Sequence, residues 1–105
     1  MKTSLFVRID LTIPGAGAVT HAAELEELDA RRCTMVRIIE LDGTGTIHGA
    51  GRPVEGVSAG MANAPEQVVP HPDTYGQFPD ISCTPLRAEE FEGLWAEALA
   101  RFPQL

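Results

Sequence analysis

Three histidines, His21, His48 and His71, are the side chains of this sequence best suited to acid–base or metal chemistry. None of them has a second histidine or a cysteine three or four residues away, so the sequence contains no local zinc-binding motif. A site could still assemble from distant segments, and His71 with Asp73 and His48 is the combination we consider. Because a His-Pro-Asp run in a loop is usually a turn, we predict no bound metal and no cofactor.

The two cysteines, Cys33 and Cys83, form no C-x-x-C pair, which excludes a zinc ribbon or a thioredoxin-type motif. Cys33 lies in an apolar run and is expected in the core. Cys83 precedes the expected C-terminal helix, where a thiolate can be activated, but no histidine stands next to it in the sequence. The serines lack a nucleophile-elbow context, and the glycines lack the lysine of a phosphate-binding loop. Together these residues favour a protein without enzymatic activity.

Acidic residues outnumber basic ones by fifteen to eight, which gives a formal net charge of −7. They gather in two clusters, one formed by Glu24, Glu26, Glu27 and Asp29 and the other by Glu89, Glu90 and Glu92. Paired carboxylates act as acid and base only where burial separates their pKa values, and both clusters are expected on exposed faces. An acidic surface instead attracts a basic protein by electrostatic steering. No basic cluster exists to hold phosphates, so nucleic-acid binding is excluded.

Alternating apolar and polar residues over 5–13 predict a strand with one buried and one solvated face. The segment 33–41 has β-branched residues on both faces, which favours a central strand covered on both sides. Its expected faces are Met35, Ile39 and Leu41 on one side, and Val36 and Ile38 on the other. Asp42-Gly43 follows and predicts a hairpin with a type I′ turn. The segment 20–29 is compatible with a helix or a strand, and both alternatives stay open.

The segment 87–102 carries the strongest helical pattern. Its apolar residues recur at i, i+3, i+4, i+7, i+8 and i+11, namely Phe91, Leu94, Trp95, Ala98, Leu99 and Phe102. This spacing makes one continuous apolar stripe on a helix. Trp95, at the centre of the stripe, is expected to anchor the helix against a sheet.

The middle of the chain gives weaker signals. Glycines without periodicity predict a loop over 49–60. A short helix is expected from Asn63 as its cap to Pro70, which stops it. The following segment, 70–85, is expected to be irregular and to be held in place by Tyr75 and Phe78.

These elements predict a single α+β domain over 1–105, with a small antiparallel meander of about four strands, a C-terminal helix on one sheet face and one short helix. The length of 105 residues suits one domain, and 44% hydrophobic residues is too high a share for a disordered chain. The apolar runs are too short for a transmembrane helix, so no membrane association is expected. No signal peptide is recognised, which makes the cytoplasm the expected location.

Two parts of the sequence resemble a family of small uncharacterised actinobacterial proteins, catalogued as a domain of unknown function. The first combines Ala23-Glu24-Leu25 with 33–43, and the second combines 78–81 with 86–95, which contains the E-F-E-x-x-W element Glu90–Trp95. Arg87 stands where the family has a serine or threonine cap, so Thr84 could cap the helix with Pro85 at its first position. The resemblance implies a strand over 20–25 and carries no catalytic residues. Some such proteins look like immunity or accessory proteins of toxin loci.

Our first functional hypothesis is therefore a non-enzymatic, acidic, protein-binding domain with a basic partner such as a toxin. The alternative is a small-molecule-binding protein or minor enzyme, with a pocket between the sheet and the segments 49–60 and 70–85. A homodimer through a sheet edge is a third possibility. The candidate binding residues are Glu24, Glu26, Glu27, His48, His71, Asp73 and Tyr75.

Overall fold

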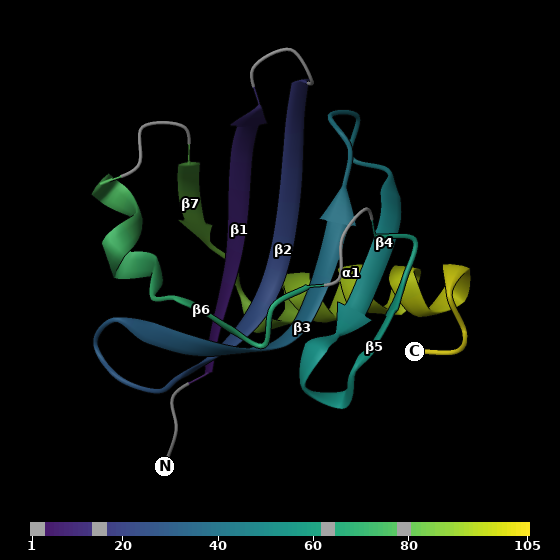
Figure 1. The fold of residues 1–105 in the computed structure, drawn as a ribbon. Helices are drawn as coiled ribbons and strands as arrows, with labels where there is room; N and C mark the ends of the chain where they lie inside the picture. Colours follow the sequence, from purple (N-terminus) through teal and green to yellow (C-terminus); the bar gives the residue numbers. More distant parts are fainter. Residues whose placement is uncertain (1–3, 14–16, 62–64, 78–80) are drawn as a thin grey trace.

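The computed structural model of the chain describes residues 4–13, 17–61, 65–77 and 81–105. These ranges contain seven strands, two 3-10 segments and one α-helix (Figure 1). In chain order they are β1 (Ser4–Ile13), β2 (Gly17–Glu27), β3 (Arg32–Leu41), β4 (Ile47–Arg52), η1 (Pro53–Glu55), β5 (Val57–Ala59), β6 (Val68–Pro70), η2 (Pro72–Gln77), β7 (Ile81–Pro85) and α1 (Ala88–Arg101). No helix in these ranges is long and apolar enough to cross a membrane.

The strands form one sheet in the order β5-β4-β3-β2-β1-β7, and β6 pairs with the start of β3. Every pairing is antiparallel, so the α+β class with a C-terminal helix is confirmed. The expected number of about four strands is wrong, because the sheet has seven. The three strands that the sequence did not indicate are β5, β6 and β7. Each has only three to five residues, which is too short for a periodic pattern to emerge.

The ambiguous segment 20–29 is strand β2 as far as Glu27. It pairs with β1 along the whole of that strand, from Ser4 opposite Glu26 to Ile13 opposite Gly17. On its other side it pairs with β3. Alternate positions of β2 bury Ala23 and Leu25 in one layer, and this packing outweighs the intrinsic helix preference of glutamate, leucine and alanine.

Strand β3 is central, as predicted, but its two faces differ from the expected ones. Leu25 pairs with Met35 and Glu24 pairs with Arg37, so Val36 is an extra residue at a β-bulge. The extra residue changes the alternation, because it places Met35 on the same face as Ile38. Ile39 and Leu41 face the other layer. The residue types of 33–41 gave no indication of this bulge.

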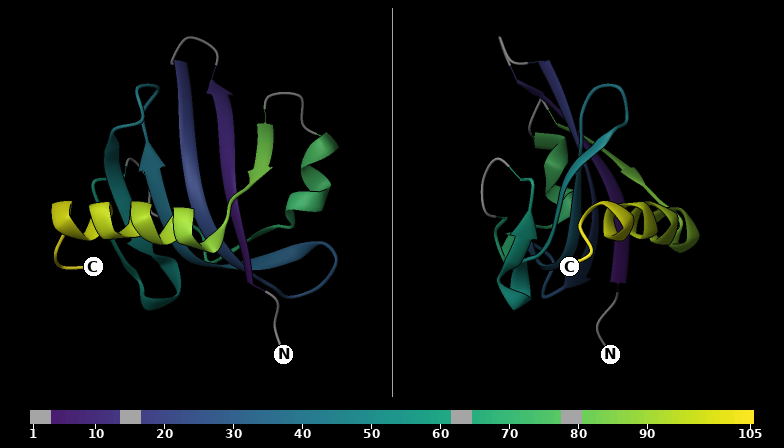
Figure 2. Two further views of the ribbon diagram at one scale, coloured as in Figure 1. Left: turned by 180° about the vertical axis from the view of Figure 1, so that it is seen from behind. Right: turned by 90° about the vertical axis from the view of Figure 1, so that its right-hand side faces the viewer.

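The sheet separates two buried layers. On one face, residues of β1, β2 and β3 pack with Tyr75 of η2. On the other face, Phe91, Trp95 and Ala98 of α1 pack against Ile39 and its neighbours on β2, β3 and β4. Figure 2 shows α1 lying across one face of the sheet, while η2 and β5 lie toward the opposite side.

Helix α1 confirms the predicted apolar stripe. Phe91 is 0% exposed and Trp95 is 4% exposed, and their rings stack with centroids 6.4 Å apart. The helix is capped by Arg87, whose backbone N–H donates to the Glu90 carboxylate at 3.2 Å. Thr84 is not the cap, because it lies in β7 opposite Arg8.

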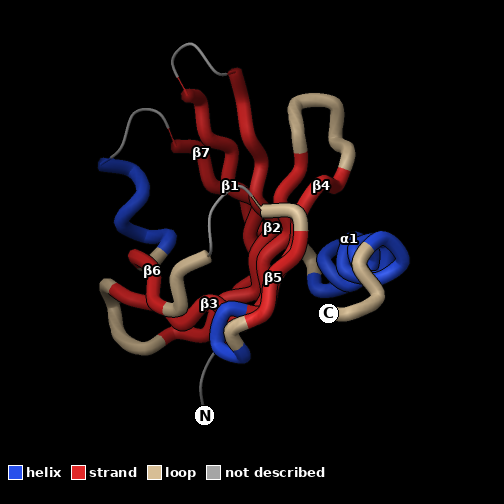
Figure 3. The backbone as a smooth tube through the Cα atoms, turned by 45° about the vertical axis from the view of Figure 1, so that its right-hand side comes forward, coloured by secondary structure: helices blue, strands red, loops and turns tan. Residues whose placement is uncertain are grey.

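The segment 49–60 is not the predicted loop. It completes β4 and continues through η1 and β5, which return as a tight antiparallel hairpin (Figure 3). Glycine permits this close approach: Gly60 has a φ of +71°, and a Cβ there would lie 2.2 Å from the carbonyl oxygen of His48. The glycines that suggested a loop are therefore what allows the backbones to meet.

Two further local predictions need correction. The hairpin after β3 is present, but its turn spans 42–46, and the positive φ belongs to Gly45 rather than to a type I′ pair at Asp42-Gly43. The described part of the predicted short helix, 65–70, is not helical and ends in strand β6. Asn63 and Phe78 lie outside the described residues.

Candidate functional site

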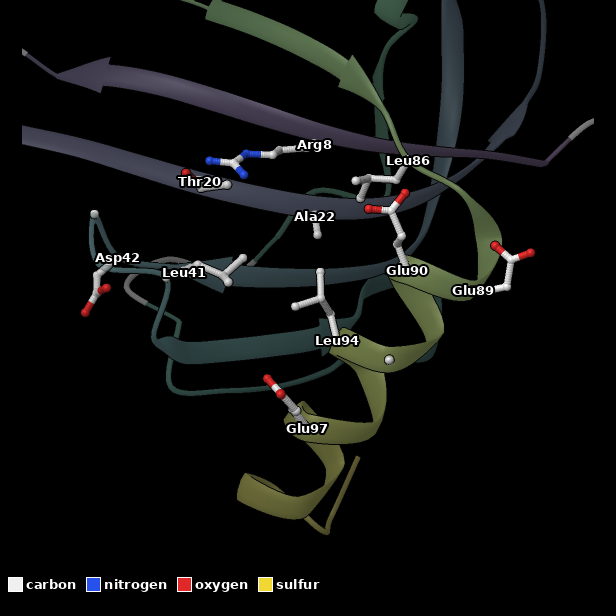
Figure 4. Close-up of a pocket in the computed structure, with 13 residues that line it drawn as sticks. Arg8, Thr20, Ala22, Leu41, Asp42, Leu86, Glu89, Glu90, Leu94 and Glu97 are labelled. Atoms are coloured by element: carbon white, nitrogen blue, oxygen red, sulfur yellow. The ribbon is translucent and has the colours of Figure 1, made fainter.

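A groove lies between α1 and the strands β1, β2 and β3, with a volume of about 520 Å³ (Figure 4). We call it the acidic groove. Its apolar lining consists of Ala22, Leu41, Leu86 and Leu94, and its carboxylates are Asp42, Glu89, Glu90 and Glu97. Arg8 is the one basic side chain among its lining residues. The groove therefore combines an apolar floor with a negatively charged rim.

The helix supplies one wall of the acidic groove through a single face. Glu90, Leu94 and Glu97 follow the i, i+4, i+7 spacing that places side chains on one side of a helix. In Figure 4 Leu94 extends toward Leu41. Gly93 lies in the same wall, and a Cβ there would meet nothing within 4 Å. The absence of a side chain at this position keeps the groove open.

Hydrogen bonds lower the pKa values of two of the rim carboxylates. The pKa of Asp42 is lowered, chiefly because the Thr44 hydroxyl donates to it at 2.6 Å and also because the backbone N–H groups of Thr46 and Thr44 donate to it. The pKa of Glu90 is lowered by hydrogen bonds from the backbone and side chain of Arg87. Both groups carry their charge at neutral pH, so the rim presents fixed negative charge to solvent.

The single cation of the groove is already partly neutralised. The Nε of Arg8 donates to Asp10 at 3.2 Å, and the Thr20 hydroxyl donates to the same carboxylate oxygen at 2.8 Å. Arg8 and Asp10 lie two positions apart on the same face of β1, so their charges partly offset each other. Arg87, next to the groove, lies 3.3 Å from Glu90 and 3.9 Å from Glu89 and offsets part of their charge. The four rim carboxylates still outnumber these two arginines, so the net charge around the groove is negative.

A second cavity, of about 560 Å³, lies where β1, β7 and the start of η2 meet. We call it the His71 pocket. His71 Nε2 lies 2.7 Å from Glu27 Oε2, and the backbone N–H of Asp73 donates to His71 Nδ1 at 3.1 Å. Because Nδ1 accepts this bond, we assign the proton of the neutral ring to Nε2, from which it is donated to Glu27. Both ring nitrogens are thus engaged.

His48 belongs to a different cluster, so the combination with His71 and Asp73 that we considered does not assemble. Its Nδ1 lies 3.3 Å from Glu40 Oε1, while His21 Nε2 lies 3.0 Å from Glu40 Oε2. Glu40 is near the end of β3, whereas the His71 backbone bonds to Arg31, just before that strand begins. Among the described residues, no group of three or more histidine, cysteine or carboxylate side chains could hold a metal ion.

The remaining candidate residues have structural neighbours. Glu24 accepts a hydrogen bond from Arg37 Nε at 2.6 Å, on the helix side of the sheet. Glu26 lies in β2 opposite Thr34. The Tyr75 hydroxyl donates to the Pro70 carbonyl at 3.1 Å, and burial raises the pKa of Tyr75 to about 12. Of the seven predicted residues, the structure thus brings Glu27, His71 and Asp73 into one cavity.

Neither cysteine is placed for nucleophilic chemistry. Cys33 is fully buried, as predicted, and Cys83 lies within β7 rather than at the helix N-terminus. The pKa of the Cys83 thiol is raised, first by burial and then by the negative charge of Asp73. It therefore remains protonated at neutral pH.

The residues of the acidic groove come from distant parts of the chain, and sequence reasoning did not assemble them. The one available signal was the helical spacing of Glu90, Leu94 and Glu97. No family model, curated protein or solved structure matches the chain.

Proposed function

We propose that this chain is a non-enzymatic protein-binding domain that holds a basic segment of a partner protein in the acidic groove. The observation that carries the proposal is the composition of the groove, which has an apolar floor, four rim carboxylates and one cation that is itself paired. Lysine and arginine suit such a site, because their hydrocarbon stems pack on apolar surface while their charged heads reach a rim. The formal net charge of −7 adds long-range attraction for a basic partner.

A basic toxin, recognised by this chain as an immunity or accessory protein, is one partner that would fit the groove. The family resemblance supports this choice of partner. An amphipathic segment with alternating arginine and leucine residues would place leucine on the floor near Leu94. Its guanidinium groups would then meet Glu90 and Glu97 at the rim. The size of the groove suits a few such side chains rather than a whole domain face.

A synthetic peptide of alternating arginine and leucine tests the proposal by isothermal titration calorimetry at several salt concentrations. The Gly93→Leu variant fills the groove without changing its charge, because a side chain at this position enters open space. Ala96→Leu is the matched control, since Ala96 is exposed on the same helix and does not line the groove. We expect Gly93→Leu to weaken peptide binding at least about tenfold and Ala96→Leu to leave it unchanged.

Charge is tested separately with Glu97→Lys, which should weaken binding and flatten its salt dependence. Glu66→Lys, an exposed charge change outside the groove, is the control. Equal peptide affinities of the Gly93→Leu and Ala96→Leu variants would show that the peptide does not bind in the acidic groove. An affinity that does not respond to salt would remove the electrostatic part of the proposal.

The alternative hypothesis of a small-molecule pocket gains support from the His71 pocket, which lies between the sheet and part of 70–85. The other expected wall, 49–60, does not contribute, because these residues form the β4–η1–β5 hairpin and are not among the pocket's lining residues. A homodimer would use one of the two path-end strands of the sheet, β5 or β7. Sedimentation velocity would detect it.

A further inference from the structure

We infer that the His71 pocket is a second binding site, which accepts a small organic cation: an ammonium group attached to a compact apolar body. The inference does not depend on the acidic groove. Leu86 lines both cavities, but no carboxylate is shared between them.

The size and walls of the pocket suit a small molecule. Its volume of about 560 Å³ falls within the range of ligand cavities in proteins. The walls are mainly apolar. They consist of Leu5, Phe6 and Val7 from β1, Pro72 from η2, Pro85 at the end of β7, and Leu86 directly after it. A ligand that enters the pocket therefore exchanges water for hydrocarbon along most of its length.

The polar end of the pocket carries negative charge only. Glu27, His71 and Asp73 line it, and no arginine or lysine does so among the described residues. The Glu27 side chain is 37% exposed and can be reached by a ligand, whereas the His71 side chain is 5% exposed and forms the buried support behind it. His71 binds one carboxylate oxygen of Glu27, and the second oxygen can accept a hydrogen bond from an ammonium group.

The state of His71 favours binding over catalysis. Nδ1 accepts the Asp73 backbone N–H, and Nε2 donates to Glu27, so the ring has no free nitrogen with which to remove a proton. Cys83 lines the same pocket, but burial and Asp73 keep its thiol protonated. The histidine therefore acts as a positioning residue that fixes the orientation of the Glu27 carboxylate.

The test uses benzylamine as the probe and benzyl alcohol as its neutral counterpart, both titrated into isotope-labelled protein and followed by NMR. We expect benzylamine to shift the amide signals of lining residues such as Leu5 and Cys83. Its affinity should be in the millimolar range, as expected for so small a ligand. It should bind about tenfold more tightly than benzyl alcohol.

Glu27→Gln removes the charge but keeps an oxygen that can accept the His71 proton, so the variant should fold. It should reduce benzylamine affinity to that of benzyl alcohol. Asp73→Asn, at a side chain that is 87% exposed, should weaken benzylamine binding about twofold without disturbing the fold. Glu66→Gln, which removes an exposed charge outside both cavities, should leave the titration unchanged.

Alkylation of Cys83 by iodoacetamide gives an independent readout. Bound benzylamine should slow the modification of Cys83, while the fully buried Cys33 stays unmodified in the native protein and reports any unfolding. Equal affinities for benzylamine and benzyl alcohol would overturn the inference, because the pocket would then select only for apolar bulk. Unchanged benzylamine binding in both Glu27→Gln and Asp73→Asn would also overturn it, as would shifts confined to the acidic groove.

Discussion

The guanidinium of Arg37 binds the carboxylate of Glu92 through two parallel hydrogen bonds, from Nη1 to Oε1 at 2.9 Å and from Nη2 to Oε2 at 2.7 Å. The two residues belong to β3 and α1. The same guanidinium lies 4.9 Å from the ring centroid of Phe91 and 5.3 Å from that of Trp95. The Glu92 hydrogen bonds raise the pKa of Arg37 despite its partial burial. This permanently charged group therefore joins the helix to the sheet.

Replacing Arg37 by methionine should destabilise the protein strongly. The Glu24 carboxylate, only 17% exposed, would lose its cationic partner, and breaking a buried pair in this way costs about 3–5 kcal/mol. Urea denaturation measures the free energy of unfolding. Arg32→Met is the matched control, because it breaks the exposed pair with Asp29 and should lower the free energy of unfolding far less than Arg37→Met. Similar losses in the two variants would contradict the structural role of Arg37.

Trp95 provides a direct check of the helix packing. It is the only tryptophan in the sequence, and its side chain is buried against the sheet. The native protein should show blue-shifted fluorescence that acrylamide quenches poorly, and unfolding should shift the emission to the red. Trp95→Ala should cost about 3–5 kcal/mol of unfolding free energy. A native indole with the emission of free tryptophan would refute the placement of α1.

Gly60→Ala should destabilise the hairpin of β4 and β5. The position has a positive φ, and the added Cβ would overlap the backbone carbonyl of His48. We expect a loss of about 2 kcal/mol or more in thermal or urea unfolding. Gly43→Ala is the control, since its Cβ meets nothing within 4 Å and should leave stability within about 1 kcal/mol. Equal losses of stability in the two variants would contradict the close contact between Gly60 and the His48 carbonyl.

Acidification should destabilise the fold through its hydrogen-bonded carboxylates. Asp42 has an ordinary pKa of 3.8 when unfolded and a lower pKa in the folded state. Its stabilising contribution is therefore fully present above pH 3.8 and is lost as the pH falls through the folded-state pKa. Protonation of Glu92 at low pH should also destabilise the fold, because hydrogen bonds from Arg37 lower the pKa of Glu92 in the folded state.

The Asp42→Asn variant isolates this effect, since asparagine keeps the oxygen that accepts from Thr44 and Thr46 but does not titrate. Melting temperatures measured from neutral pH down to below pH 3.8 should fall less steeply for the variant than for the wild type. Parallel curves over this interval would show that the Asp42 turn contributes nothing to acid sensitivity.

The elements that the sequence predicted are those whose packing follows a simple period. Strand β1 alternates, β3 is apolar on both faces, and α1 carries a continuous stripe that ends on Phe102. Each of these elements presents apolar side chains to a buried layer, and β3 does so on both of its faces. The short strands β5 to β7 show no such period, because three to five residues are too few for an alternation to emerge, and β6 and β7 each end on a proline.

The candidate sites were less predictable because their residues meet only through the fold. Glu27 and His71 are 44 positions apart, and the register of β2 and the position of η2 bring them together. The sequence did indicate His71 and Asp73 together, because they are two positions apart and the hydrogen bond from the Asp73 backbone N–H to His71 forms within that short segment. The acidic groove depends on where α1 crosses the sheet, a geometry that no residue pattern in either element specifies.

The two-sided packing of the sheet has a consequence for how this protein can change over time. Ile38 and Ile39 are adjacent in the chain, yet they belong to different interiors. A substitution at Ile38 therefore affects the packing beneath η2, whereas a substitution at Ile39 affects the packing against α1. Substitutions that reshape the helix layer can accumulate while the layer beneath η2 stays intact, so the acidic groove and the His71 pocket are free to diversify at different rates.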